Sequence, residues 1–268
     1  MAAENPAVRL VEKVGRGTVR ALDEIGFAAV LMAESLYWLV AGRRKRQPVR
    51  VAAVFQQARE IGVDALPILS VLSFTIGVML AIQGIYTLKA FGAESRVATG
   101  IALSVVREFS SLITGVLVAG RSGSALAARL GTMKINQEID ALTVMGIEPV
   151  RYLVAPPLVA MVVVVPALTM WAHLVALFGA GLYVTGELQI SFGAYVSQVI
   201  EALRLADLAH GLAKSGIFAV LITLVGVVNG ALVSGGAEGV GRITTRSVVH
   251  AISAIVITDM IFAFAVTR

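Results

Sequence analysis

An uncharged stretch decides the fold class of this chain: residues 65–88 read ALPILSVLSFTIGVMLAIQGIYTL, and Lys89 ends the run. A helix needs about 20 mostly apolar residues to cross the hydrocarbon core of a bilayer. This stretch meets that length without a single Asp, Glu, Lys or Arg. It therefore predicts a transmembrane helix.

The composition of the whole chain points the same way. Of its 268 residues, 57% are hydrophobic and 15% are charged, against about 25% charged in a typical soluble domain. This balance excludes a soluble globular protein, and it excludes a disordered chain because disorder requires low hydrophobicity. The chain has no cysteine, which excludes disulfides, thiolate metal sites and a cysteine nucleophile. Its histidines are scattered at positions 173, 210 and 250, so we expect no metal site.

Four further apolar stretches have the length of a membrane span. Together with the first, they predict five transmembrane helices at about residues 65–88, 97–120, 153–184, 208–233 and 247–267. We therefore predict an all-α membrane protein in which residues 47–268 form one five-span domain.

The first 46 residues differ from these spans. Residues 25–42 are apolar, but Glu34 interrupts them and they are short for a crossing. Four basic residues before them are spaced three or four apart: Arg9, Lys13, Arg16 and Arg20. That spacing puts them on one helical face, and a basic face beside an apolar face is typical of a helix in the membrane interface. We predict an interfacial amphipathic segment over 1–46; the alternative is a solvated helix packed on a partner.

The distribution of basic residues predicts the orientation in the membrane. The formal charge is +5, and a basic run, Arg43-Arg44-Lys45-Arg46, precedes the first span. Because Lys and Arg concentrate on the cytoplasmic side, this run places the N-terminus in the cytoplasm, and five spans then leave the C-terminus outside. We attribute the positive charge to this orientation and expect no nucleic-acid partner.

A short amphipathic helix is predicted after the second span, over about 135–147. Asn136 is suited to cap its start and Gly146 to end it, with Pro149 just beyond. Its apolar stripe consists of Ile135, Ile139, Leu142 and Met145. At about 1.5 Å per residue this helix cannot cross a bilayer. One interpretation is docking into a groove of a soluble partner; the other is a helix that lies on the interface and binds nothing.

Several separate motifs occur in order along the chain. Three are Ala119-Gly-Arg-Ser-Gly-Ser-Ala-Leu-Ala-Ala-Arg-Leu-Gly131, Glu138-Ile-Asp-Ala-Leu and Met145-Gly-Ile-Glu-Pro149. Others are Ile82-Gln83-Gly84, Val106-Arg-Glu108, Lys214-Ser215, Asn229-Gly230, Thr244-Thr-Arg-Ser-Val-Val-His250 and Asp259. From about residue 50 to the C-terminus, the chain closely resembles the MlaE permease family, the membrane subunits of lipid-transporting ABC systems. It departs from the family at 109–111, where Phe-Ser-Ser stands in place of the Leu-Gly-Pro of many relatives.

The resemblance implies a fold, a function and a set of partners. The chain would have the permease fold of that family and form a homodimer in the bacterial inner membrane, with a periplasmic C-terminus. It would move phospholipid between the inner membrane and a periplasmic MCE hexamer (MlaD-like), and so maintain outer-membrane lipid asymmetry. A cytoplasmic ABC ATPase (MlaF-like), bound in many relatives by a STAS protein (MlaB-like), would hold ATP and Mg²⁺.

The resemblance also makes the short helix the coupling helix that docks on the ATPase. Its candidate contact residues are Gln137, Glu138, Asp140, Leu142 and Met145. The chain itself has no Gly-x-x-x-x-Gly-Lys-Ser/Thr loop for a nucleotide. We therefore expect no catalytic residue, no metal and no cofactor in this chain, which would be a transport subunit and not an enzyme.

Ionisable residues inside predicted spans are Arg107, Glu108, Lys214 and Asp259. A charge at the bilayer centre costs about 2.5–3.5 kcal/mol on insertion scales, so we expect these groups to neutralise one another as a network. Counted along the helices at about 1.5 Å per residue, Lys214 and Asp259 lie at similar depth. The network has three interpretations. In the first, it takes part in transport, by coupling helix movement to ATP hydrolysis or by lining the path of a lipid headgroup. In the second, it is an ion-pair lock that fixes helix packing, and in the third it is a proton relay.

Lipid contacts are expected in the outer half of the first span, where the dimer cavity of this family opens. Our candidates are Leu80, Leu88 and Phe91, and the alternative is that they face the bilayer or neighbouring helices. Other functions stay open at this point. They are a permease for another hydrophobic cargo such as a sterol or an organic solvent, a proton-coupled secondary transporter, and a membrane scaffold that transports nothing.

Overall fold

The computed structural model describes residues 6–42, 44–45 and 47–266, and the regular elements of this part are all helices. The α-helices are α1 (Pro6–Ala41), α2 (Val51–Gly62), α3 (Leu66–Lys89), α4 (Val97–Ser104), α5 (Ser110–Val118), α6 (Ser124–Ile135), α7 (Glu138–Val144), α8 (Ala155–Leu188), α9 (Phe192–Ala202), α10 (Leu205–Ala231) and α11 (Gly236–Val266). Short 3₁₀ or π turns adjoin them at η1 (Val63–Ala65), η2 (Glu94–Arg96), η3 (Val105–Phe109), η4 (Ala119–Gly123) and η5 (Val150–Val154). The predicted all-α class is confirmed.

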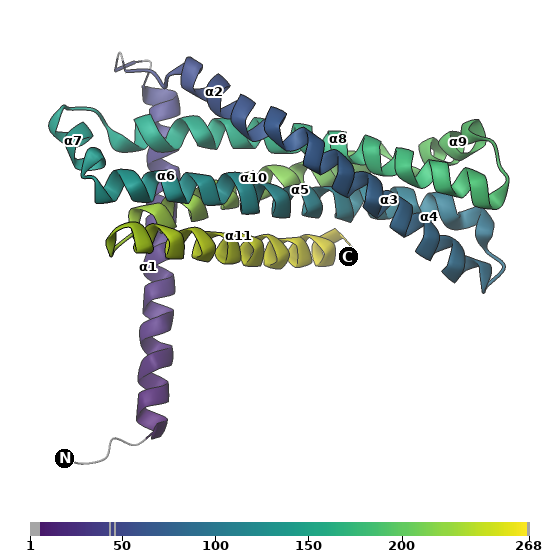
Figure 1. The fold of residues 1–268 in the computed structure, drawn as a ribbon, viewed down its shortest axis with the longest axis horizontal. Coiled ribbons are helices and arrows are strands. Elements are labelled where there is room, and N and C mark those ends of the chain that lie inside the picture. Colours follow the sequence, from purple (N-terminus) through teal and green to yellow (C-terminus); the bar gives the residue numbers. More distant parts are fainter. Residues whose placement is uncertain (1–5, 43, 46, 267–268) are drawn as a thin grey trace.

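In the described part of the chain, six helical runs are long and apolar enough to cross a membrane, judged by length and composition. They are Gly15–Ala41, Val51–Lys89, Glu94–Ile135, Val150–Leu188, Leu205–Ala231 and Gly236–Ala265. Helices α5, α6, α8, α10 and α11 lie nearly parallel, α2 and α3 cross them obliquely, and α1 lies across the end of the bundle (Figure 1). A bilayer has a single normal, so a bundle that spans it leaves α1 along its surface. Gly15–Ala41 is itself long and apolar enough to cross, so the interfacial position of α1 stays a prediction.

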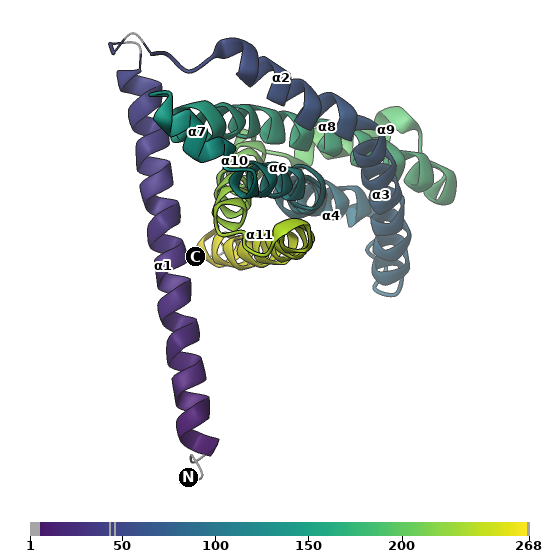
Figure 2. The ribbon, with the colours of Figure 1, turned by 60° about the vertical axis from the view of Figure 1, so that its left-hand side comes forward.

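The two ends of the bundle differ in how many basic residues their segments carry: Arg50, Arg129, Lys134, Arg151, Arg242 and Arg246 at one end, and Lys89, Arg96 and Arg204 at the other. We call the end that carries α1, α2 and α7 the basic end, and the opposite end, with η2 and α9, the far end (Figures 1 and 2). At the basic end, Arg246 of α11 forms an ion pair with Glu24 of α1, and Leu31 of α1 is buried against α6 and α10. Other predicted features lie outside the described side chains: Arg9, Lys13 and Arg20 of the basic face, Arg43 and Arg46 of the basic run, and Thr267 at the end of the last span.

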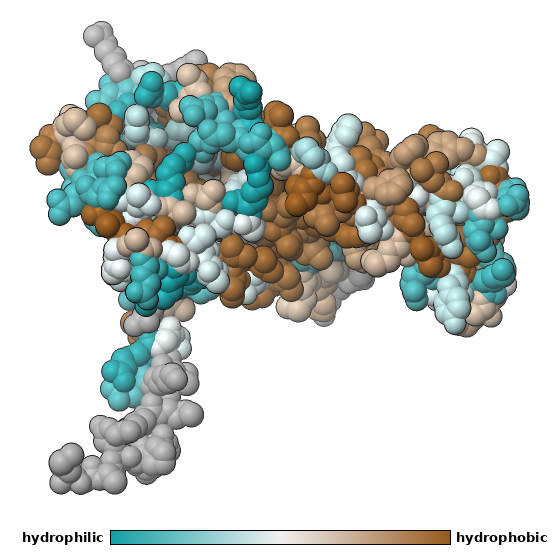
Figure 3. Space-filling view, viewed as in Figure 1, coloured by the Kyte–Doolittle hydropathy of each residue, from teal (hydrophilic) through white to brown (hydrophobic). Residues whose placement is uncertain are grey.

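Between the two ends, the surface of the bundle is apolar. Figure 3 shows hydrophobic side chains over its middle and hydrophilic ones gathered toward both ends. Large exposed apolar residues on the long helices include Val71, Trp171 and Ile257. An exposed apolar surface of this extent indicates contact with a membrane or a protein, and its position across the long helices fits the hydrocarbon core.

Small residues let the long helices approach closely. At Gly77 of α3, an added Cβ atom would collide with the carbonyl oxygen of Ala176 in α8. At Gly230 of α10, a Cβ atom would lie 2.7 Å from the Cβ of Leu130 in α6. Such residues are enriched where membrane helices meet, because association there depends on close van der Waals packing.

The second predicted span is longer and less regular than expected. Its helical run reaches Ile135 instead of ending near residue 120, and two π turns, η3 and η4, interrupt it. Turn η3 contains both Arg107 and Glu108. The chain stays helical after this turn, and the Ser111 hydroxyl donates a hydrogen bond to the Glu108 carbonyl at 2.9 Å. A π turn is often found at a functional site, and here it coincides with the charged pair.

The short helix after the second span is α7, which is shorter than the predicted 135–147. Asn136 ends α6 instead of capping α7, because Gln137 takes a left-handed conformation (φ 58°) and turns the chain between the two helices. Gly146, with φ 73°, follows the end of α7. Glycine adopts this backbone region without steric cost, which makes it a common residue after a helix.

The helical run that contains the first predicted span begins well before residue 65. Elements α2, η1 and α3 follow one another without a break from Val51 to Lys89, and the run bends between α2 and α3 (Figure 2). At 1.5 Å per residue it is about 60 Å long, measured along the helix axis. It packs along α8 over both of its parts, and Ala65, in the 3₁₀ turn that divides it, is buried in the same cluster as Met161 of α8. The run thus connects the basic end with the far end.

Candidate functional site

A buried lysine joins three helical segments inside the bundle. The side chain of Lys214, on α10, has no exposed surface. Its Nζ atom donates a hydrogen bond to Glu108 Oε2 of η3 at 2.5 Å, and lies 2.6 Å from Asp259 Oδ1 of α11. The second contact is an ion pair without the alignment of a hydrogen bond. The structure thus brings together three of the four charged residues that the sequence singles out.

The fourth, Arg107, has a different partner. Its Nε atom lies 2.7 Å from Oδ1 of Asp207, whose side chain is 7% exposed in the first turn of α10. The other carboxylate oxygen of Asp207 accepts a hydrogen bond from the backbone N–H of Arg204 at 2.9 Å, which caps the start of α10. Sequence reasoning misses Asp207 because it begins the fourth span at residue 208. The sequence does contain a pattern that could have identified Asp207. It lies seven residues before Lys214, so the two share one face of a helix.

Two ion-pair sites, one around Lys214 and one between Arg107 and Asp207, connect the π turn η3 to the rest of the bundle. Adjacent residues of η3 reach α10 at two points, Arg107 at Asp207 and Glu108 at Lys214, while Asp259 adds α11. Two cations face three carboxylates, so the group carries one excess negative charge. Within the described residues, no set of three His, Asp or Glu side chains is placed to hold a metal ion. The arrangement is suited to holding helix positions, and its role in transport stays a prediction.

A groove toward the far end contains two of the predicted lipid-contact residues. Leu80 and Leu88 of α3 are half-buried and line a groove of about 270 Å³ between α3 and α4. Gln83 and Thr87 add polar groups to its lining. Phe91 lies outside the groove and is 79% exposed. An apolar groove with a few polar groups is the usual form of a site for an apolar ligand.

Helix α7 presents a mixed face at the basic end (Figure 1). Of the predicted coupling residues, four are exposed: Gln137, Glu138, Asp140 and Met145. Leu142 instead is half-buried and packs with Ile139 against the buried cluster of α6 and α10, so its side chain faces its own bundle. Val144, which the sequence analysis did not select, is 89% exposed and is the better apolar contact on this helix.

Comparisons with known proteins give the family. The family described as Permease MlaE matches residues 54–265. The intermembrane phospholipid transport system permease protein MlaE of Haemophilus influenzae is 31% identical over 251 residues, or 91% of this chain and 92% of that protein. A probable ABC transporter permease protein of Rickettsia typhi is 29% identical over 262 residues, or 95% of this chain and 98% of that protein.

A more distant organism also has a similar protein. The chloroplastic protein TRIGALACTOSYLDIACYLGLYCEROL 1 of Arabidopsis thaliana is 32% identical over 208 residues, which cover 78% of this chain and 59% of that protein. The family match covers the long apolar helices from α2 onward, but not α1, and it includes both ion-pair sites of the bundle. The chain is therefore a multi-pass membrane protein that belongs to the MlaE permease family.

Proposed function

We propose that this chain is the permease subunit of an ABC transporter that moves phospholipid between the inner membrane and a periplasmic MCE carrier, and thereby maintains outer-membrane lipid asymmetry. The observation that carries the proposal is the family match over residues 54–265. The Haemophilus relative, similar over nearly its whole length, is named for intermembrane phospholipid transport.

The groove between α3 and α4 supports a lipid cargo. It combines apolar walls at Leu80 and Leu88 with polar groups at Gln83 and Thr87, which suits an acyl chain that continues into a polar headgroup. In a homodimer of this chain, two such grooves would contribute to one cavity that opens at the far end. The far end would then face the periplasm and the MCE hexamer.

The basic end would face the cytoplasm and a separate ATPase. Most basic loop residues gather there, as expected for the cytoplasmic side of a membrane protein. The chain has no nucleotide loop, so ATP and Mg²⁺ would be held by the partner, with a STAS protein bound to that partner. Docking would use the exposed face of α7, including Glu138, Val144 and Met145.

Co-purification of the chain with its cognate ATPase tests this assignment. Val144→Asp places a charge on the exposed face of α7, so we expect it to remove the ATPase while the unfolding midpoint of the permease stays unchanged. Leu142→Asp is the matched control on the same helix. Because Leu142 packs against the bundle, its variant should lower the unfolding midpoint. Full ATPase recovery with Val144→Asp would contradict α7 as the docking helix.

The cargo and the energy source are tested on the intact complex. Native mass spectrometry should find bound phospholipid, and proteoliposomes should transfer phospholipid only with ATP. If a sterol or another hydrophobic compound is bound in place of phospholipid, that compound is the cargo and the phospholipid proposal is wrong. If transfer needs a proton gradient and no ATP, the chain is a secondary transporter and the ABC mechanism is wrong.

A further inference from the structure

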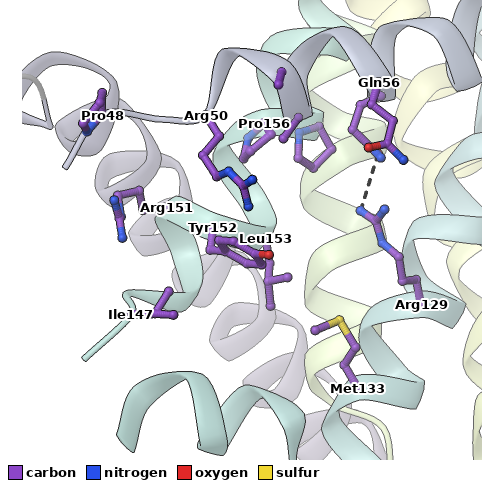
Figure 4. Close-up of a pocket in the computed structure, with 14 residues that line it drawn as sticks. Pro48, Arg50, Gln56, Arg129, Met133, Ile147, Arg151, Tyr152, Leu153 and Pro156 are labelled. Atoms are coloured by element: carbon purple, nitrogen blue, oxygen red, sulfur yellow. Dashed lines mark hydrogen bonds between the residues drawn. The ribbon is translucent and has the colours of Figure 1, made fainter. Parts of the chain in front are cut away.

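A cleft at the basic end gathers three arginines from three different segments. It has a volume of about 550 Å³ and lies between the start of α2, helix α6 and turn η5. The arginines are Arg50 before α2, Arg129 of α6 and Arg151 of η5. Figure 4 shows them on different sides of the cleft, with Arg50 directed toward its middle. We call it the arginine cleft; it lies far from the groove between α3 and α4.

The described residues that line this cleft include no carboxylate. Arg129 donates a long hydrogen bond of 3.4 Å to the amide oxygen of Gln57, a neutral partner. The buried Nε atom of Arg151 has no hydrogen-bond partner. Three positive charges therefore share one cleft without a counter-charge. An anion in the cleft would supply the missing counter-charge.

Aromatic side chains place the cleft at the level of the lipid headgroups. The guanidinium of Arg50 lies 5.9 Å from the ring of Tyr152, and that of Arg151 lies 5.7 Å from the ring of Trp38. Trp38 belongs to α1, the helix that runs across the end of the bundle. Trp and Tyr gather at the membrane–water interface, and the cytoplasmic leaflet presents anionic lipids at that depth.

The chemistry of the lining fits a lipid with a phosphate group. Planar guanidinium groups bind phosphate oxygens through paired hydrogen bonds. Beside the arginines, Met133, Leu153 and Pro156 provide an apolar wall. Leu153 also lines a neighbouring, mostly apolar pocket of about 220 Å³ between α1 and α6, in which Glu34 is the one charged residue among the described lining residues. A headgroup at the arginines would thus have apolar surface next to it for the chain that follows.

We propose that the arginine cleft binds the phosphate group of an anionic lipid of the cytoplasmic leaflet. This site is separate from the transport groove. It rests on the cytoplasmic position of the basic end proposed above, but not on the proposed cargo or on the ATPase. Basic pockets on the cytoplasmic side of membrane proteins commonly bind anionic headgroups. A bound lipid would link α2, α6 and η5. Among the described residues, these segments otherwise meet here through the Arg129–Gln57 hydrogen bond, the contact of Arg50 with the Tyr152 ring and apolar contacts.

Lipid titration of the full chain in detergent, followed by native mass spectrometry, tests the proposal. The probes are dioleoylphosphatidylglycerol, which is anionic, and dioleoylphosphatidylcholine, which has the same acyl chains and no net charge. The double variant Arg129→Gln/Arg151→Gln should bind the anionic lipid roughly 30-fold more weakly, and its binding of the zwitterionic lipid should not change. Arg96→Gln removes an arginine at the far end and should bind both lipids as the unchanged chain does.

Three results would overturn the proposal. Equal affinity of the unchanged chain for the two lipids would show that charge is not recognised. Displacement of the anionic lipid by an equal concentration of sn-glycerol 3-phosphate would assign the cleft to a soluble phosphate compound. Loss of ATPase co-purification by the double variant with unchanged lipid affinity would assign it to an acidic surface of that protein. The unfolding midpoint is measured in parallel, and if the double variant does not fold, Arg151→Gln alone should still weaken anionic-lipid binding about fivefold.

Discussion

Replacing Lys214 with methionine tests whether the buried ion pairs hold the bundle together. Methionine is long and unbranched, so it fills most of the same space without the charge. Glu108 and Asp259 then lose the ammonium that lies 2.5 and 2.6 Å from them. Both carboxylates stay beside one small site, where like charges repel and neither has the partner that offsets its desolvation.

The expected loss of stability follows from the burial of the three groups. Removing one partner of a buried pair costs about 3–5 kcal/mol. Lys214 has no exposed side-chain surface and Asp259 has 17%, but Glu108 is 38% exposed and is screened in part. We therefore expect a loss near the lower limit, about 3 kcal/mol. At about 2–4 °C for each kcal/mol in a chain of this size, the unfolding midpoint in detergent should fall by about 6–12 °C, measured by tryptophan fluorescence.

Two further variants make the result interpretable. Lys134→Met removes the partner of Asp140 at the surface, where the side chains are 42% and 62% exposed. Exposed pairs contribute at most about 1 kcal/mol, so this control should lose no more than about 4 °C. Adding Glu108→Gln and Asp259→Asn to Lys214→Met removes the two carboxylate charges that have lost their partner. This triple variant should recover most of the lost unfolding midpoint. Equal midpoints for Lys214→Met and the control, or no recovery in the triple variant, would refute the reasoning.

Other parts of the structure give further predictions. Arg107→Gln should lower the unfolding midpoint by several degrees because it strands Asp207, 7% exposed, and Asp207→Asn should restore part of the loss. Gly77→Val should abolish the monodisperse peak in size-exclusion chromatography, because its side chain would collide with α8, whereas Gly186→Ala meets nothing within 4 Å and should keep that peak. Leu88→Trp should fill part of the 270 Å³ groove and lower ATP-driven lipid transfer in proteoliposomes at an unchanged unfolding midpoint. An unshifted midpoint in Arg107→Gln would contradict the first prediction, and a normal chromatographic peak for Gly77→Val would contradict the second. Full lipid transfer by Leu88→Trp would contradict the third.

Hydropathy predicts much of this bundle for a physical reason. In lipid, each spanning segment must satisfy its own backbone hydrogen bonds, so it becomes one long helix that the sequence displays as one apolar run. The run 65–88 corresponds closely to α3. The same cost of burial makes an isolated charge conspicuous, and depth along the helix then places Lys214 level with Asp259. The structure has these two side chains in contact.

Features that depend on tertiary geometry could not be found in this way. The partner of Arg107 depends on how α10 begins, and the sequence alone does not show that Asp207 sits inside the capped turn. The exposed face of α7 depends on the left-handed turn at Gln137, which sets how α7 folds back on the bundle. Leu142 therefore has the pattern of a docking residue but contacts its own chain.

The helical run from Val51 to Lys89 connects the two ends of the bundle. One end of it borders the arginine cleft, and its other end forms a wall of the groove at Leu88. Both parts of the run pack on α8, and Ala65, in the 3₁₀ turn between them, is buried in the same cluster as Met161 of α8. A displacement of α2 at one membrane surface would therefore reach the groove wall at the other surface through α8 as well as along the run itself.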